Sequence, residues 1–108
     1  MKSRMLDWHE AEALIRELRA MAALPAGPAP AKVRRAKEIR YLLARQPGAN
    51  GDLVEKADHA HRLIETLLSA RRWRAVPSLD FLRKDLKSAC ERLKVYAQAA
   101  YRRAGRAA

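Results

Sequence analysis

The chain has 108 residues, 23 of them Lys or Arg and 12 Asp or Glu, which gives a formal net charge of +11 at pH 7. A single cysteine excludes an intrachain disulfide, and no apolar run approaches the roughly 18 residues that a membrane-spanning helix needs. This length fits one domain, residues 1–108, with one modest core.

The first predicted helix begins after Asp7 and ends before the segment 24–30. Asp7 and Glu10 have the spacing of a capping box, in which each side chain accepts a hydrogen bond from the other residue's backbone N–H. From Trp8 to Ala22 apolar residues recur at helical spacing and predict one buried face. Three prolines within residues 25–30 cannot continue a helix and predict a stiff connector.

The second helix is expected from Pro30 to about Arg45, because proline is well tolerated in a first helical turn. Its predicted buried residues are Val33, Ala36, Ile39 and Leu43. The segment 46–51 contains Pro, Gly and Asn and predicts a turn.

The third helix is expected to open at a second capping box, Asp52 and Glu55, and to end around Arg72. Its apolar stripe is Leu53, Ala57, Ala60, Ile64, Leu67 and Leu68. Pro77 then breaks the helical pattern.

The fourth and longest helix is expected from about Leu79, with Ser78 as its N-cap, to Arg103, and Gly105 is expected to end it. Its buried seam is predicted to be Leu79, Leu82, Leu86, Ala89, Leu93, Tyr96 and Ala100. Four amphipathic helices with short connectors predict an all-α fold, a small antiparallel four-helix bundle with a long C-terminal helix. No sequence feature decides whether the first and fourth helices are neighbours.

Positive charge is segregated into two stripes and one cluster. The stripe on the second helix is Arg34, Lys37, Tyr41 and Arg45, and the stripe on the fourth helix is Lys84, Lys87, Lys94 and Arg102. The cluster between the third and fourth helices is Arg71, Arg72, Trp73 and Arg74. Such segregation is typical of a protein that meets a polyanion, and an aromatic ring in a basic stripe suits stacking on a base. For Trp73 we favour the alternative role of a lid over the end of the core.

We therefore expect a non-catalytic protein that binds RNA or single-stranded DNA, rather than duplex DNA, mainly through phosphate contacts. The turn over 46–51 is longer than that of a helix-turn-helix, which argues against readout in the major groove. In size, helicity and basicity the chain is similar to the small subunits of CRISPR effector complexes and to the accessory proteins of diversity-generating reverse transcriptases. These architectural resemblances imply a small subunit or accessory factor of a ribonucleoprotein or other nucleic-acid-processing complex.

The alternative is a small protein-binding inhibitor or adaptor of phage type, such as an anti-CRISPR protein, that sets a basic face against an acidic protein surface. Phe81 and Val95 lie on the side of the fourth helix away from its seam and are candidates for a protein interface or a homo-oligomer contact. The discriminating feature is charge distribution. Nucleic-acid binding requires the two stripes to converge on one surface, whereas a protein binder is expected to combine a basic rim with an exposed apolar patch.

No constellation of residues predicts catalysis, a metal or a cofactor. His59 and His61 stand two apart on a helix and point in different directions, while His61 and Glu65 have the spacing of a helix pair. Arg4 and His9 resemble the Arg-x4-His ribonuclease motif of HEPN-type bundles, which implies acid–base cleavage of RNA by His9. The match covers six residues, and we favour a salt-linked turn instead. Cys90 falls near the seam and is expected to be a buried apolar residue.

Compartment and source are expectations from composition alone. The basic residues at the N-terminus are followed by acidic ones and not by an apolar segment, so we expect no signal peptide, no membrane partner and a cytoplasmic location. The lone cysteine agrees with a reducing compartment. The content of Ala, Arg and Leu is compatible with a bacterial or phage source.

Overall fold

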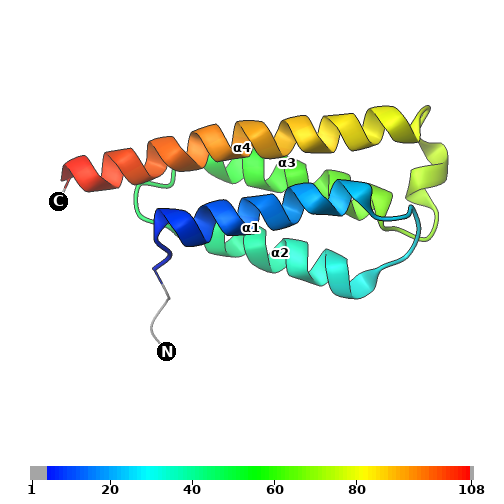
Figure 1. Cartoon of the computed structure of the whole chain (residues 1–108), viewed down its shortest axis with the longest axis horizontal. Helices are drawn as coiled ribbons and strands as arrows, with labels where there is room; N and C mark the ends of the chain where they lie inside the picture. Colours follow the sequence, from blue (N-terminus) through cyan, green and yellow to red (C-terminus); the bar gives the residue numbers. More distant parts are fainter. Residues whose placement is uncertain (1–4, 108) are drawn as a thin grey trace.

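The computed structural model describes residues 5–107, which are all-α and contain no strand. Its elements are α1 (Trp8–Ala20), the 3-10 helix η1 (Met21–Ala23), α2 (Pro30–Ala44), α3 (Gly51–Leu67), the 3-10 helix η2 (Arg72–Ala75) and α4 (Leu79–Ala107). Successive α-helices run in opposite directions along the bundle (Figure 1). The predicted helical bundle is therefore confirmed, and α4, with 29 residues, is its longest helix.

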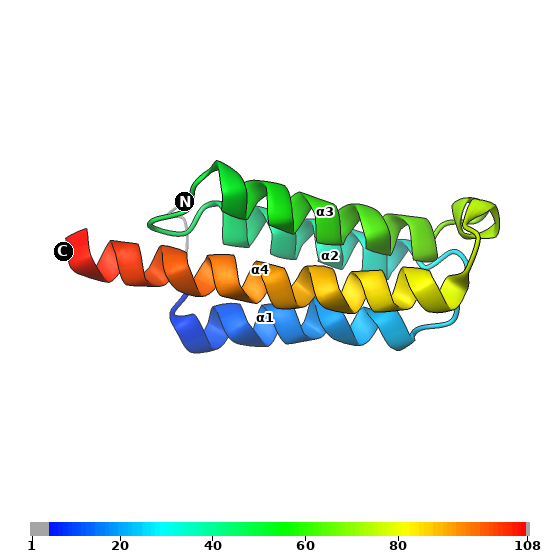
Figure 2. The same cartoon turned by 90° about the horizontal axis from the view of Figure 1, so that it is seen from above.

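The order of the helices around the bundle decides which surface residues can meet. α4 packs against α1 and α3, and α2 packs against the same two helices. α2 and α4 therefore lie across a diagonal of the bundle, on opposite sides of the core (Figure 2). Each surface groove is formed by one of the four neighbouring pairs.

The core consists of the apolar faces that helical spacing predicts. Its largest fully buried side chains are Leu18, Ile39, Leu43, Leu53, Ile64, Leu67, Leu86, Leu93 and Cys90. Trp8, Val33, Leu79 and Tyr96 are only partly buried and pack against its edge. Cys90 is buried as predicted, and burial raises the pKa of its thiol to about 12, so the reactive thiolate is suppressed.

Three helix starts have a side-chain N-cap, at α1, α3 and α4, and at α3 the capping residue differs from the predicted one. At α1 the Asp7 carboxylate accepts from the Glu10 N–H at 2.7 Å, and Glu10 accepts from the Asp7 N–H at 3.5 Å. At α3 the predicted capping box is wrong, because the cap is Asn50, whose Oδ1 accepts from the Leu53 N–H at 3.0 Å. Asn is as good an N-cap as Asp, and Asp52 falls instead in the first turn, where its charge favours the helix N-terminus.

Two helix ends differ from their predicted positions. α3 ends at Leu67 and not near Arg72, because the Ser69 hydroxyl donates to the Thr66 carbonyl at 2.9 Å and accepts from the Arg72 N–H at 2.8 Å. These bonds tie the chain into the turn that leads to η2. α4 continues through Gly105 to Ala107, because Gly105 lacks the positive φ with which glycine ends helices. Ser78 caps α4 as predicted, by accepting from the Phe81 N–H at 3.1 Å.

The turn between α2 and α3 is held against the C-terminal half of α4. Gly48 has a φ of +76°, and a Cβ placed on it would lie 2.2 Å from the Ala100 carbonyl oxygen. The Tyr101 hydroxyl donates to the Leu6 carbonyl at 2.9 Å and lies 3.2 Å from Gln46 Oε1, which also accepts from the Leu6 N–H at 2.8 Å. This junction joins three segments that are remote in the sequence.

Candidate functional site

The α2 stripe lies on the surface, and its tyrosine is in contact with an arginine of the same stripe. Arg34, Lys37, Tyr41 and Arg45 are all exposed. The Arg45 guanidinium lies 4.9 Å from the centre of the Tyr41 ring and also donates to the Tyr41 hydroxyl. One face of the ring is therefore covered by a cation, and only the other is open to a base.

The α4 stripe is also exposed, but on the other side of the molecule. Lys84, Lys87, Lys94 and Arg102 are exposed, and Lys94 pairs with Glu12 of α1 at 3.2 Å. Because α2 and α4 are diagonal partners, their outward stripes point away from each other. The predicted nucleic-acid site built from both stripes is therefore wrong, and a nucleic-acid site on this bundle has to be formed on one side of it.

A different set of cations gathers on the surface formed by α2 and α3, and we call this surface the α2/α3 face. Arg34 and Arg72 line one groove between the start of α2 and the end of α3, together with Glu65. Further along, Asp58 of α3 accepts from Arg40 of α2 at 3.1 Å and from Arg62 of α3 at 3.0 Å. The face is defined by Arg34, Lys37, Arg40, Arg62 and Arg72, with the acids Asp58 and Glu65.

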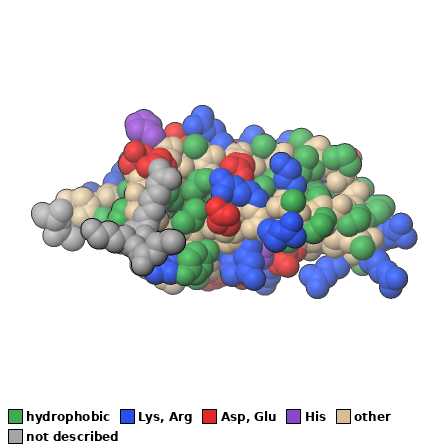
Figure 3. Space-filling model, turned by 90° about the horizontal axis from the view of Figure 1, so that it is seen from below, with side chains coloured by type: hydrophobic (Ala, Val, Ile, Leu, Met, Phe, Trp, Pro, Cys, Tyr) green, Lys and Arg blue, Asp and Glu red, His purple; other side chains and the backbone are tan. Residues whose placement is uncertain are grey.

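Three cations of the α2/α3 face have no acidic partner within residues 5–107: Arg34, Lys37 and Arg72. Figure 3 views the bundle from the side of α2 and shows Lys and Arg side chains along its lower edge, where α3 lies, and at the end that carries η2. The face thus keeps a surplus of positive charge open to solvent.

The neighbouring α1/α2 groove is neutral by comparison. Arg35 donates to Glu17 at 2.6 Å and to Glu38 at 2.6 Å, so one cation bridges two acids. The hydrogen bond from Arg35 holds the pKa of Glu17 below its ordinary value, which keeps the carboxylate charged. The positive surplus is therefore confined to particular faces.

The groove between α1 and α4 is the second basic face, which we call the α1/α4 face. Its two acids pair across it, Glu12 with Lys94 at 3.2 Å and Glu91 with Arg19 at 3.4 Å. Arg16, Lys84 and Lys87 make no ion pair with any residue that the structure describes. This face holds the predicted α4 stripe but no exposed aromatic ring.

Trp73 lies in η2, half-buried, and it is not part of the hydrophobic core cluster. The Arg74 guanidinium lies 5.3 Å from the centre of its indole ring, and its indole N–H is buried without a hydrogen-bond partner in the described chain. Arg71, Arg72 and Arg74 around it are exposed. The indole ring therefore lies against Arg74 at this end of the bundle and outside the core cluster.

Sequence analysis missed Arg40 and Arg62. Arg62 stands four residues after Asp58, a spacing that predicts a helix pair and so suggested no function. Arg40 lies between the outward stripe and the buried face of α2, and it joins the site only because α3 is the neighbour on that side. Its role depends on the order of helices around the bundle.

His61 is buried at the α2/α3 boundary, with 7% of its surface exposed. Its Nδ1 lies 3.4 Å from Glu65 Oε1, which confirms the predicted pair, while its Nε2 is buried without a hydrogen-bond partner in the described part of the chain. Burial lowers the pKa of His61 below its ordinary value of 6.5, and the charge of Glu65 offsets only part of that effect.

This buried imidazole predicts a pH-dependent stability. Below pH 6.5 the unfolded chain binds a proton at His61 that the folded chain does not, so the free energy of unfolding falls as the pH drops from about 7.5 toward 5.5. We expect the melting temperature to fall over this range and the fall to be smaller in His61→Gln. His59→Gln, which removes a half-buried imidazole of α3 on the side of α4, is the control and is expected to keep the slope of the unmodified chain.

The other residues considered for catalysis or metal binding do not come together among the residues that the structure describes. Arg4 lies outside the described residues, and His9 is exposed on α1. Within residues 5–107 no three metal-ligating side chains gather in one place. No described helix is both long and apolar enough to cross a bilayer.

Phe81 and Val95, the predicted protein-interface residues, are exposed in different grooves. Phe81 is 70% exposed and lines the groove between α3 and α4. Val95 is 65% exposed and lines the groove of the α1/α4 face. The two residues therefore do not form one patch.

No protein family, curated protein or solved structure matches this chain. The arrangement of its own residues is what bears on its function.

Proposed function

We propose that the protein binds single-stranded nucleic acid, RNA or single-stranded DNA, through phosphate contacts on the α2/α3 face. The observation that carries the proposal is the gathering of five cations on that face against two acids, with Arg34, Lys37 and Arg72 unpaired among the described residues. Each cation of the face that neutralises a phosphate releases counterions condensed on the nucleic acid, and this release contributes to affinity.

The chemistry of the face suits a flexible strand. Four of its five cations are arginines, whose planar guanidinium binds phosphate oxygens in a bidentate manner. Tyr41 lies beside them on α2, 55% exposed, with one ring face open for a base. The α1/α4 face offers cations without an aromatic ring, so we place the strand on the α2/α3 face.

The antiparallel packing of α2 and α3 favours a single strand over duplex DNA. Neither helix projects from the bundle as a recognition helix that would enter a major groove (Figure 1). A small bundle of this kind would act without catalysis, as a subunit or accessory factor within a larger nucleic-acid-processing complex.

Fluorescence anisotropy with labelled single-stranded RNA, single-stranded DNA and duplex DNA tests the proposal. With three to five phosphate contacts, we expect log K to fall with log salt at a slope of about −2 to −3.5 for the single strands. Duplex DNA is expected to bind more weakly. Absence of binding at about 50 mM salt, or an affinity independent of salt, would contradict the proposal.

A further inference from the structure

The groove between α3 and α4 has an apolar half near η2. Its apolar lining is Leu63, Val76, Pro77, Phe81 and Leu82, and Asp85 is its charged member. Phe81 is the most exposed of the large hydrophobic side chains in the described chain, at 70%. Covering an exposed aromatic ring removes apolar surface from water, so a partner that fills this half gains free energy.

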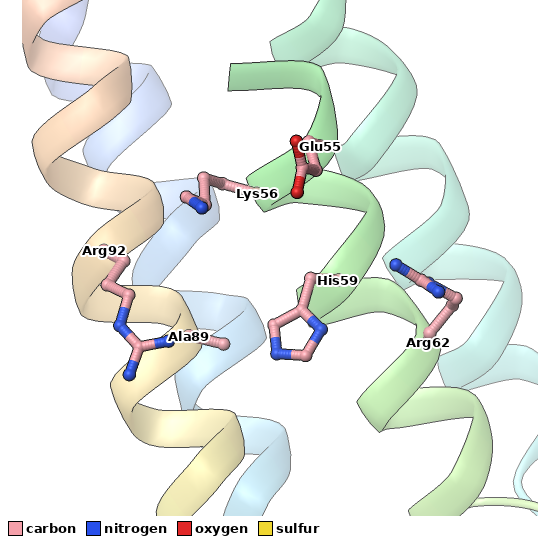
Figure 4. A pocket seen from close by; sticks show the side chains of 6 residues that line it. All are labelled: Glu55, Lys56, His59, Arg62, Ala89 and Arg92. Atoms are coloured by element: carbon pink, nitrogen blue, oxygen red, sulfur yellow. The ribbon is translucent and has the colours of Figure 1, made fainter. Parts of the chain in front are cut away.

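The same groove continues toward the middle of the bundle as a cationic half. Lys56 and His59 project from α3 toward α4, and Arg92 lies along α4 on the other side of the pocket, beside Ala89 (Figure 4). Lys56 and Arg92 form no ion pair with any described residue, and Glu55 is the acid at this site. Arg62 also lines this pocket, on the side away from Arg92 (Figure 4), and its ion pair with Asp58 at 3.0 Å joins it to the α2/α3 face as well.

We propose that the α3/α4 groove binds an acidic amphipathic helix of a partner protein. Its apolar side chains, three and four positions apart, would cover Phe81, and its carboxylates would meet Lys56 and Arg92. Arg92 follows Phe81 by 11 positions on α4, which is roughly 16 Å along the helix axis. A partner helix of about three turns spans both halves.

Charge favours an acidic partner protein over a second copy of this chain. Each copy carries a formal charge of +11, so two cationic halves brought together would repel each other. Nucleic acid is a poor fit for the apolar half, because its lining includes no cation and its one charged residue, Asp85, repels phosphate. The groove is thus a second interaction surface, which shares Arg62 with the α2/α3 face.

The test uses a dansyl-labelled synthetic peptide of about 18 residues, long enough to span both halves as a helix. It carries Leu and Phe at helical spacing at one end and Glu at the other, and its control has the same composition in scrambled order. Phe81→Ser is expected to weaken binding of the amphipathic peptide by about tenfold or more, since tenfold corresponds to 1.4 kcal/mol. Arg92→Glu is expected to weaken it similarly.

Val95→Ser is the matched control, because Val95 is an exposed apolar residue of α4 that lies outside this groove. It is expected to leave the affinity within about twofold of that of the unmodified chain. Equal binding of the scrambled peptide, or unchanged binding to Phe81→Ser, would overturn the proposal. So would a dimer of the unmodified chain in sedimentation that Phe81→Ser dissociates. RNA binding of Phe81→Ser is measured as well. If RNA binding persists while the peptide results contradict the proposal, the failure concerns the α3/α4 groove and not the proposed function of the α2/α3 face.

Discussion

A chain with a reversed α2/α3 face is expected to bind single-stranded RNA about 10²–10³-fold more weakly than the unmodified chain at about 0.1 M salt. The four replacements by Glu are at Arg34, Lys37, Arg62 and Arg72. Each single-strand phosphate contact adds about 0.7 to the slope of log K on log salt, a roughly fivefold effect at this salt concentration. Losing four contacts multiplies four factors of roughly five, which gives a loss of about 10²–10³-fold. All four side chains are exposed, so circular dichroism should show unchanged helicity.

A matched reversal on the α1/α4 face separates a defined face from general charge. Its replacements are at Arg16, Lys84, Lys87 and Lys94. In both sets three cations lack a described acidic partner and the fourth has one, Lys94 with Glu12 at 3.2 Å and Arg62 with Asp58 at 3.0 Å. The change in net charge is the same. We expect a loss below about tenfold for this set, and an equal loss in both would show that binding is spread over the whole surface.

Gly48→Ala is expected to lower the free energy of unfolding by about 3 kcal/mol or more. A residue with a Cβ loses about 1–2 kcal/mol in the left-handed conformation that Gly48 adopts, with its φ of +76°. The new methyl group would also lie 2.2 Å from the Ala100 carbonyl oxygen, so the turn would have to leave α4. That movement would break the hydrogen bond from Arg103 Nη2 to the Gly48 carbonyl, now 2.9 Å long. Thermal denaturation should show a loss of more than about 10 °C.

Gly105→Ala is the control for this substitution. Gly105 lies within α4, and a Cβ placed there meets nothing within 4 Å. Alanine is a better helix former than glycine, so the same replacement is expected to raise stability by up to about 1 kcal/mol. If Gly48→Ala melted within a few degrees of the unmodified chain, close contact between the turn and α4 would be disproved.

Helices and their buried faces could be predicted because they depend on local spacing. The stripe that includes Leu53, Ile64 and Leu67 is fully buried, and the Asp7 capping box forms. The start of α3 was misplaced because Asn50 and Asp52 are equally good caps, and the sequence offers no means of choosing between them. Gly105 was misread because a glycine ends a helix only when its backbone adopts the left-handed conformation.

The candidate site could be predicted only in part, because a surface depends on which helices are neighbours. Spacing placed Arg34 and Lys37 on one side of α2 correctly, and both are exposed. It could not show that α4 lies diagonally opposite, nor that Arg40 would meet Asp58. A four-helix bundle has several possible orders of helices, and local periodicity is the same in all of them.

The hydrogen bond from Tyr101 to Leu6 also bears on how the chain folds. It joins residues 95 positions apart, whereas most contacts in a helical bundle are local and form early. Closing a loop of that length loses chain entropy that no single hydrogen bond recovers, so the contact can form only after α1 and α4 have docked. We therefore expect the end of the bundle held by Tyr101, Gln46 and Leu6 to assemble late, after the helices have docked.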